Sequence, residues 1–231
     1  YKQPFFEALG VKYLGPVDGN DIERLQVVLE EAKKCSCCTL VHIKTKKGCG
    51  YKYAEDKPEK YHSVGAFDPD EGVSVPGGND YSSAFGRALC ERAEKDDRIC
   101  AITAAMRDGT GLRAFSERFP QRFFDVGIAE EHAVAFAGGL AVSGLLPVCA
   151  LYSTFAQRTY DQLIHDVALQ KLHIVLALDR AGFVSGDGET HQGVFDAAFL
   201  SEIPGAELYA PYSFEELSVA LDHALAGTGI S

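Results

Sequence analysis

The stretch FFDVGIAEEHAVAFAGGLAVSGLLPVCALYSTF, residues 123–155, indicates how the chain folds. Residues 123–126 and 147–152 are short apolar runs typical of strands, and residues 130–142 between them have the pattern of a buried helix. Two further runs, ICAITAA (99–105) and HIVLAL (173–178), are apolar except for Thr103 and His173. Strands that are apolar on both faces are typical of a parallel sheet covered by helices on each side. We therefore predict an α/β fold with a doubly wound, mostly parallel sheet.

The predicted elements fall into two groups. The first group is a helix over 21–34 and a strand over 39–44. Residues 53–79 are rich in Pro and Gly and predict a loop, with a domain boundary near residue 79. In the second group we predict helices over 81–94, 112–118, 130–142, 157–169 and 214–225, and strands over 99–104, 123–126, 147–152, 174–178 and 208–210, with a polar loop over 182–193.

Composition excludes several classes of protein. The 231 residues carry 22 Lys and Arg against 33 Asp and Glu, a net charge of −11, which argues against a nucleic-acid or anionic-membrane partner. Residues 133–157 carry no charge, but Gly138, Gly139 and Pro147 divide them into a helix and a strand, so we predict no membrane span. Seven cysteines, an odd number, favour a reducing compartment and a cytoplasmic location. We expect Cys35, Cys37 and Cys38 to be inert buried thiols, and we predict no metal site.

Residues that can carry chemistry follow the predicted strands. In a doubly wound sheet, ligands bind at the carboxyl ends of the strands. The candidates there are Met106, Ile128, Glu130, Tyr152, Phe155, Arg158, Arg180, Asp187 and His191. Each has an ordinary structural explanation: a glutamate in a first helical turn suits the helix dipole, and single arginines form surface ion pairs. Their convergence on one edge, and the position of His191 in a Gly-rich loop, predict a functional site.

Seven stretches resemble the 1-deoxy-D-xylulose-5-phosphate synthase family, which consists of transketolase-like thiamine-diphosphate enzymes. They are GPVDGND (15–21), TKKGCGY (45–51), YHSVGAFD (61–68), ITAAM (102–106), FPQRFFDVGIAEEHAVAFAGGLA (119–141), YSTFAQRTYDQLIHDVALQ (152–170) and LDRAGFVSGDGETHQGVFD (178–196). They cover most of the chain in the family order. The resemblance implies that residues 1–65 are the tail of a first, diphosphate-binding domain, that 66–79 are a linker, and that 80–231 are an incomplete pyrimidine-binding domain.

The resemblance also implies a cofactor, thiamine diphosphate. Glu130 matches the residue that accepts a hydrogen bond from the ring nitrogen of the aminopyrimidine. Phe155 would stack on that ring, with apolar packing from Ile128 and Met106. Tyr51 and Lys47 match cofactor-contacting positions in the TKKGCGY loop, with Lys47 near the diphosphate.

The implied substrates are pyruvate and D-glyceraldehyde 3-phosphate. Pyruvate would lose CO2, and its two-carbon unit would give 1-deoxy-D-xylulose 5-phosphate for isoprenoid, thiamine and pyridoxal biosynthesis. Arg180 and Tyr152 match residues that bind the aldehyde's phosphate, for which a planar guanidinium is suited. Residues matching the surroundings of the pyruvate-derived group are Arg158, Asp187, His191 and His62. His191 is expected to give or take a proton.

The family's ligands for Mg²⁺ lie in an N-terminal part that this sequence lacks. We therefore expect an internal fragment without synthase activity of its own, and a homodimer in the complete protein. Arg107 and Asp108 stand where the family commonly has Pro and a small residue. Another transketolase-type thiamine enzyme and a non-catalytic binding module remain as alternative interpretations.

Overall fold

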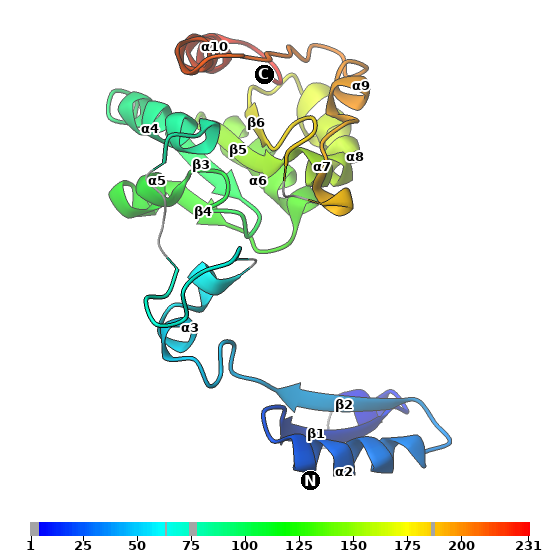
Figure 1. Cartoon of the computed structure of the whole chain (residues 1–231). Coiled ribbons are helices and arrows are strands. Elements are labelled where there is room, and N and C mark those ends of the chain that lie inside the picture. The colour runs from blue at the N-terminus through cyan, green and yellow to red at the C-terminus, as the bar shows by residue number, and fades with distance from the viewer. Residues whose placement is uncertain (1–4, 63, 74–77, 186–187) are drawn as a thin grey trace. The chain divides into compact units, whose positions relative to one another are not determined.

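The computed structural model describes residues 5–62, 64–73, 78–185 and 188–231, and the chain divides into two compact units, Tyr1–Pro76 and Gly77–Ser231. The predicted site residue Asp187 lies outside the described residues. Figure 1 labels the helices and strands of both units.

The first unit contains a parallel pair of strands with a helix packed beside it. It contains α1 (Phe5–Ala8), β1 (Lys12–Asp18), α2 (Ile22–Lys33), β2 (Thr39–Lys44) and α3 (Lys52–Asp56), followed by a 3₁₀ helix over Pro58–Tyr61. The helix and strand predicted over 21–34 and 39–44 are confirmed. Asp21 caps α2, because its carboxylate accepts a hydrogen bond from the Arg24 backbone N–H at 3.0 Å.

Two parts of this unit differ from the sequence prediction. Strand β1 was not predicted, because it contains Gly15 and Pro16, and proline lacks the N–H that a strand needs. The pairing of β1 with β2 is irregular between Leu14 and Val17, which accommodates these two residues. The predicted loop over 53–79 is wrong at its start, where α3 and the 3₁₀ helix form.

The second unit is built on a parallel sheet with the strand order β4-β3-β5-β6. Its strands are β3 (Ile99–Thr103), β4 (Phe123–Asp125), β5 (Leu146–Tyr152) and β6 (Val175–Asp179). Its α-helices are α4 (Tyr81–Ala93), α5 (Arg113–Arg118), α6 (Glu130–Val142), α7 (Ser153–Ala156), α8 (Tyr160–Gln162), α9 (Asp196–Leu200) and α10 (Phe214–Ala226). The predicted α/β class and parallel sheet are confirmed.

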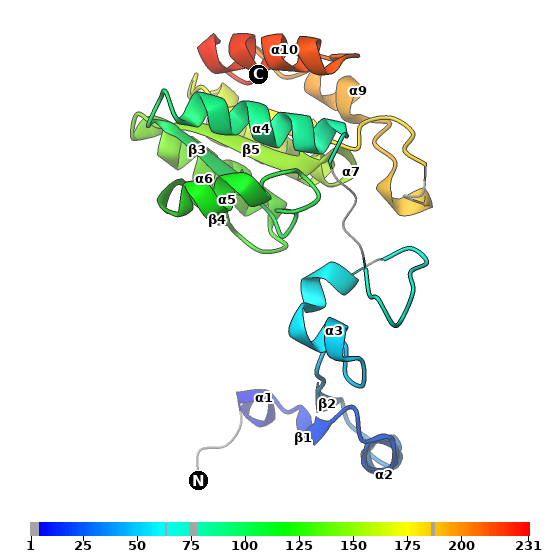
Figure 2. The same cartoon turned by 60° about the vertical axis from the view of Figure 1, so that its left-hand side comes forward.

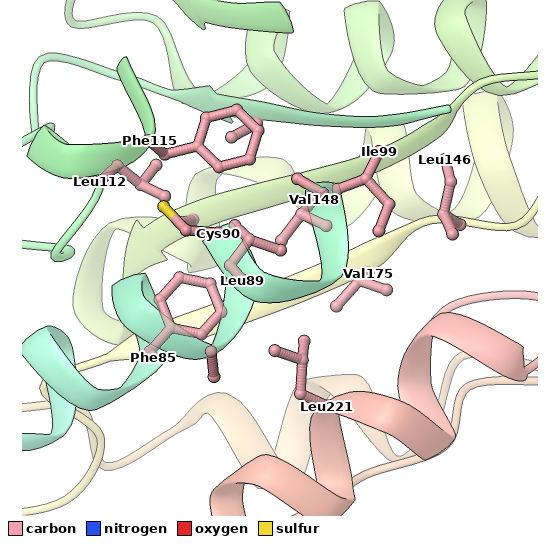
Figure 3. Packing of buried hydrophobic residues seen from close by; sticks show 14 of the residues in the cluster. Phe85, Leu89, Cys90, Ile99, Leu112, Phe115, Leu146, Val148, Val175 and Leu221 are labelled. Carbon is pink, nitrogen blue, oxygen red and sulfur yellow. The ribbon is translucent and has the colours of Figure 1, made fainter. Parts of the chain in front are cut away.

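Alternate residues of the strands build two cores, one on each face of the sheet. Ile99 and Val148 face the core shared with α4, α5 and α10, which Figure 3 shows in close-up. Ile102 and Leu151 face the core shared with α6 and α9. Helices α4 and α10 lie side by side (Figure 2). Both faces of the sheet are therefore covered, as a doubly wound fold requires.

Two predicted elements of this unit differ in the structure. The predicted helix over 157–169 starts earlier, at Ser153, and is broken into α7, a 3₁₀ turn (Gln157–Thr159), α8 and a π-helix (Leu163–Ala168). The strand predicted over 208–210 is wrong, because Leu208 and Tyr209 are exposed and pair with no strand among the described residues. Ile230 makes the bridge to Ile174 at the edge of β6 instead.

The cysteines are free thiols. Cys90, Cys100 and Cys149 are buried, whereas Cys37 and Cys38 are exposed, so the expected burial of these two thiols is wrong. Among the described residues, no helix combines the length and apolar character needed to cross a membrane.

Candidate functional site

The connections that follow β3, β4, β5 and β6 carry the predicted residues of the second unit. The ends of β3 and β4 are joined by Asp125, whose Oδ1 accepts hydrogen bonds from the Ala105 N–H at 2.8 Å and the Gly127 N–H at 3.0 Å. Ala105 and Arg180 have left-handed backbones, each with φ of 59°. Non-glycine residues rarely adopt this conformation, and it is concentrated at functional sites.

A buried carboxylate lies at the start of α6. Glu130 is the first residue of that helix, and its side chain is 2% exposed. The N-terminal end of a helix favours negative charge. Glu130 Oε2 accepts a hydrogen bond from Arg158 Nη1 at 2.9 Å, and the Arg158 side chain is 46% exposed. The ion pair thus joins a carboxylate removed from water to a guanidinium that water can reach.

An aromatic side chain lies beside this ion pair. The Arg158 guanidinium carbon is 5.0 Å from the centre of the Phe155 ring, within the range of a cation–π contact. The rings of Phe155 and His191 meet edge to face with centres 5.3 Å apart. His191 Nδ1 lies 2.7 Å from Thr190 Oγ1, and the Thr190 carbonyl accepts a hydrogen bond from Thr154.

A second arginine–aromatic pair continues the row. The Tyr152 and Phe155 rings are nearly parallel, with centres 6.1 Å apart, and the Arg180 guanidinium carbon lies 4.1 Å from the Tyr152 ring centre. The Tyr152 backbone N–H donates to Met106 Sδ at 3.3 Å. A Cβ added to Gly109 would overlap the Tyr152 hydroxyl, so a larger residue there would have to displace the Tyr152 side chain. The structure therefore brings Glu130, Arg158, Phe155, Tyr152 and Arg180 into one continuous row, with His191 against Phe155; we call it the strand-end row.

The other predicted residues lie in different settings. Met106 is buried and Ile128 is 82% exposed. Lys47 Nζ lies 2.9 Å from His62 Nδ1 in the first unit. Tyr51, also in that unit, packs against Tyr61 and donates its hydroxyl to the Pro69 carbonyl. Removal from water and the Tyr61 hydroxyl raise the pKa of Tyr51 to about 12, so it is protonated at neutral pH.

The unusual Arg107–Asp108 pair is internally compensated. Asp108 accepts a hydrogen bond from Arg107 at 2.8 Å and also pairs with Arg113. Burial would raise the pKa of Asp108, but the hydrogen bonds from the two guanidinium groups outweigh it and hold the pKa below its usual range. The carboxylate is therefore ionised at neutral pH.

Sequence reasoning gave no role to Asp179, the last residue of β6. Its Oδ2 accepts a hydrogen bond from Ser82 Oγ at 2.6 Å, and burial raises its pKa despite that bond. The signal was present, because Asp179 is the first charged residue after an apolar run and directly precedes Arg180. Asp179 also lines a largely apolar cavity of about 760 Å³ between β6 and α10. No cluster of potential metal ligands was found in the described parts of the chain.

Comparisons with known proteins identify relatives of both units. The family model described as "Transketolase, pyrimidine binding domain" matches residues 78–230, and the model described as "1-deoxy-D-xylulose-5-phosphate synthase" matches residues 1–45. The 1-deoxy-D-xylulose-5-phosphate synthase of Clostridium acetobutylicum is 55% identical over 96% of this chain, and that of Caldanaerobacter subterraneus is 56% identical over 92%. The chain spans 36% and 34% of the lengths of these relatives.

Two solved structures have a similar fold. A split-gene transketolase, described as an inactive β4 tetramer, matches 67% of this chain and 50% of its own with a TM-score of 0.59 at 27% identity. The transketolase of Campylobacter jejuni matches 98% of this chain and 46% of its own with a TM-score of 0.58 at 18% identity. Since the family model covers well over half of the sequence, the chain belongs to the transketolase pyrimidine-binding-domain family, and its curated relatives are 1-deoxy-D-xylulose-5-phosphate synthases.

Proposed function

We propose that this chain supplies the pyrimidine-recognising part of a 1-deoxy-D-xylulose-5-phosphate synthase. The observation that carries the proposal is the buried carboxylate of Glu130, beside the Phe155 ring, in a chain 55% identical to a protein of that name. The activity joins a two-carbon unit from pyruvate to D-glyceraldehyde 3-phosphate, with loss of CO2.

The residues present fit thiamine diphosphate. Glu130 offers a hydrogen-bond acceptor that is almost fully removed from water, where such a bond is stronger than at the surface. Phe155 offers a ring on which an aminopyrimidine can stack, and the exposed Ile128 offers apolar surface to cover it. When bound, the cofactor supplies the electron sink for decarboxylating a 2-oxo acid.

The remainder of the strand-end row fits the substrates. Arg180, which lies over the Tyr152 ring, is proposed to bind the phosphate of the aldehyde, for which its charged and planar donor group is suited. His191 is proposed to transfer a proton near the pyruvate-derived group, with Asp187 and Arg158 as further polar contacts. An imidazole side chain can both donate and accept a proton, which suits this role.

The first unit completes the proposal. Tyr51, Lys47 and His62 are proposed to contact the cofactor and the pyruvate-derived group, with residues 1–65 as the tail of a diphosphate-binding domain, 66–79 as a linker and 80–231 as the pyrimidine-binding domain. Mg²⁺ would be held by residues outside this sequence. The homodimer and the cytoplasmic location stay predictions.

The test uses a protein that spans the full length of the relatives. Release of CO2 from pyruvate in the presence of D-glyceraldehyde 3-phosphate is measured for the wild type, Glu130→Ala and Glu131→Ala. Glu131 is the matched control, because it is the exposed neighbour of Glu130 in the same helical turn. We expect Glu130→Ala to lose a factor of about 100 or more, as for loss of an acid–base group, and Glu131→Ala to retain the activity.

Full activity of Glu130→Ala would overturn the proposal. Use of a ketose phosphate in place of pyruvate would assign the protein to another transketolase-type activity. The 231-residue chain alone is expected to release no CO2, and turnover by it would contradict the incomplete site proposed above.

A further inference from the structure

Arg158 contacts both groups that the proposed function assigns to pyrimidine recognition. Its Nη1 donates to Glu130 Oε2 at 2.9 Å, and its guanidinium carbon lies 5.0 Å from the centre of the Phe155 ring. The same side chain thus satisfies the buried acceptor and covers the aromatic face.

We propose that Arg158 is an internal substitute for the aminopyrimidine: its guanidinium occupies the pyrimidine place in the free protein and swings out when the ring enters. The inference rests on the proposed function, because it takes Glu130 and Phe155 as the pyrimidine contacts. It adds a regulatory step at that site, an exchange of one planar donor for another.

The chemistry of the two groups makes the exchange possible. A guanidinium is flat, carries N–H donors in its plane and stacks on aromatic rings. A protonated aminopyrimidine ring has the same features, an in-plane N–H for the carboxylate and a flat face for the phenyl ring. An acceptor as buried as Glu130 is costly to leave without a partner, so a donor that takes the place of the ring stabilises the free protein.

The surroundings make Arg158 the part that moves. It belongs to the 3₁₀ turn between α7 and α8, and its side chain is 46% exposed, so its guanidinium has water beside it. Glu130 is buried at the start of α6, and Phe155 is held by the rings of Tyr152 and His191. A fixed acceptor and a fixed ring therefore face a guanidinium on a long flexible stem.

Occupation of the site by Arg158 lowers the affinity for the pyrimidine ring, because the ligand has to break the Arg158 contacts before it forms its own. A half-exposed ion pair and a half-exposed cation–π contact are each weak. Together they correspond to a factor of about 3 to 30 in the dissociation constant.

The experiment measures binding of 4-amino-5-hydroxymethyl-2-methylpyrimidine, the pyrimidine half of thiamine, to the full 231-residue chain. This probe has no diphosphate, so its binding does not depend on diphosphate ligands or on a metal. Titrations followed by amide chemical shifts in NMR spectra detect dissociation constants in the millimolar range. We expect Arg158→Gln to bind the probe about 3 to 30 times more tightly than the wild type, and Arg158→Lys, which keeps the charge but not the planar group, to lie between them.

The chain provides a matched control in Arg118. Its side chain is also 46% exposed, and it also joins a carboxylate, Glu94, to a phenyl ring, that of Phe119. Arg118→Gln removes the same kind of contacts away from the strand-end row, and we expect it to bind the probe as the wild type does.

An Arg158→Gln chain that binds no more tightly than the wild type, including one with no detectable binding, overturns the inference. Glu130→Gln separates this outcome from failure of the proposed function. If Glu130→Gln weakens probe binding while Arg158→Gln fails to strengthen it, pyrimidine recognition by Glu130 is supported. The proposal that Arg158 occupies the pyrimidine site is then refuted. Undiminished binding by Glu130→Gln overturns both.

Discussion

Replacing the two partners of the Glu130–Arg158 ion pair should have unequal effects on stability. Arg158→Gln leaves a carboxylate that is 2% exposed without its cation. Loss of one partner of a fully buried pair costs about 3–5 kcal/mol. Since Arg158 is 46% exposed and water can enter when it is removed, we expect a smaller loss of about 1–3 kcal/mol.

Glu130→Gln should change the stability by less than about 1 kcal/mol. The half-exposed ion pair it removes is worth roughly 0–1 kcal/mol, and the amide that replaces the carboxylate is easier to remove from water. The double variant then resembles Glu130→Gln, because no buried charge remains to be neutralised. The coupling energy between the two side chains then equals the loss caused by Arg158→Gln alone, about 1–3 kcal/mol.

Urea unfolding followed by circular dichroism measures this cycle. Because the chain has two units, the transition is assigned to the second unit with the fluorescence of a reporter attached to it. In thermal unfolding, a change of 1 kcal/mol corresponds to about 2–4 °C for a domain of this size. The reasoning is refuted if the two single variants lose equal amounts of unfolding free energy and these losses add in the double variant. That result would show that the Glu130 carboxylate does not depend on Arg158 for its stability.

Three other predictions concern the second unit. Burial raises the pKa of Asp179, so the folded state binds its proton more tightly than the unfolded state, and stability falls as the pH rises from about 4, the ordinary carboxyl pKa, through the raised value. Asp179→Asn should therefore gain stability relative to the wild type at pH 7 but not at pH 3; an equal difference in urea midpoints at both would contradict this. A Cβ at Gly109 would lie 2.7 Å from Tyr152 Cζ and would displace the Tyr152 side chain. In the full-length protein, Gly109→Ala should therefore raise KM for the aldehyde phosphate but not for pyruvate. Equal changes in both KM values would count against the proposed phosphate contact. A Cβ at Gly86 would overlap a backbone carbonyl, whereas one at Gly139 meets nothing within 4 Å. Gly86→Ala should therefore lower the unfolding free energy by about 1–3 kcal/mol, and Gly139→Ala should raise or preserve it. Melting temperatures of the two variants measure this difference.

Apolar periodicity was sufficient to predict the sheet of the second unit. The runs at 99–105 and 173–178 form β3 and β6, because only buried parallel strands tolerate such continuous apolarity. The same reasoning failed at Leu208 and Tyr209, which are exposed and pair with none of the strands that the structure describes. It also missed β1, where a local signal from Pro16 outweighed the pairing with β2.

For the site, the sequence could predict an edge of the sheet but not the contacts within it. Position after a strand identified Glu130, Phe155 and Arg180. The pairing of Glu130 with Arg158, 28 residues away, depends on how the segment after β5 is broken into short helical pieces, which periodicity had predicted as one helix starting later. Asp179 was predicted to follow the strand over 174–178 but received no role, because its contact with Ser82, 97 residues away, could not be read from the sequence.

The left-handed backbone of Arg180 limits how this protein can be made more heat-resistant. Such a backbone costs a residue with a Cβ about 1–2 kcal/mol. Glycine is therefore the replacement that a screen for heat resistance alone would select at this position. That replacement would delete the cation above Tyr152. Engineering programmes that rank variants by melting point alone would therefore lose the phosphate contact proposed for Arg180, unless each selection round also measures ligand binding.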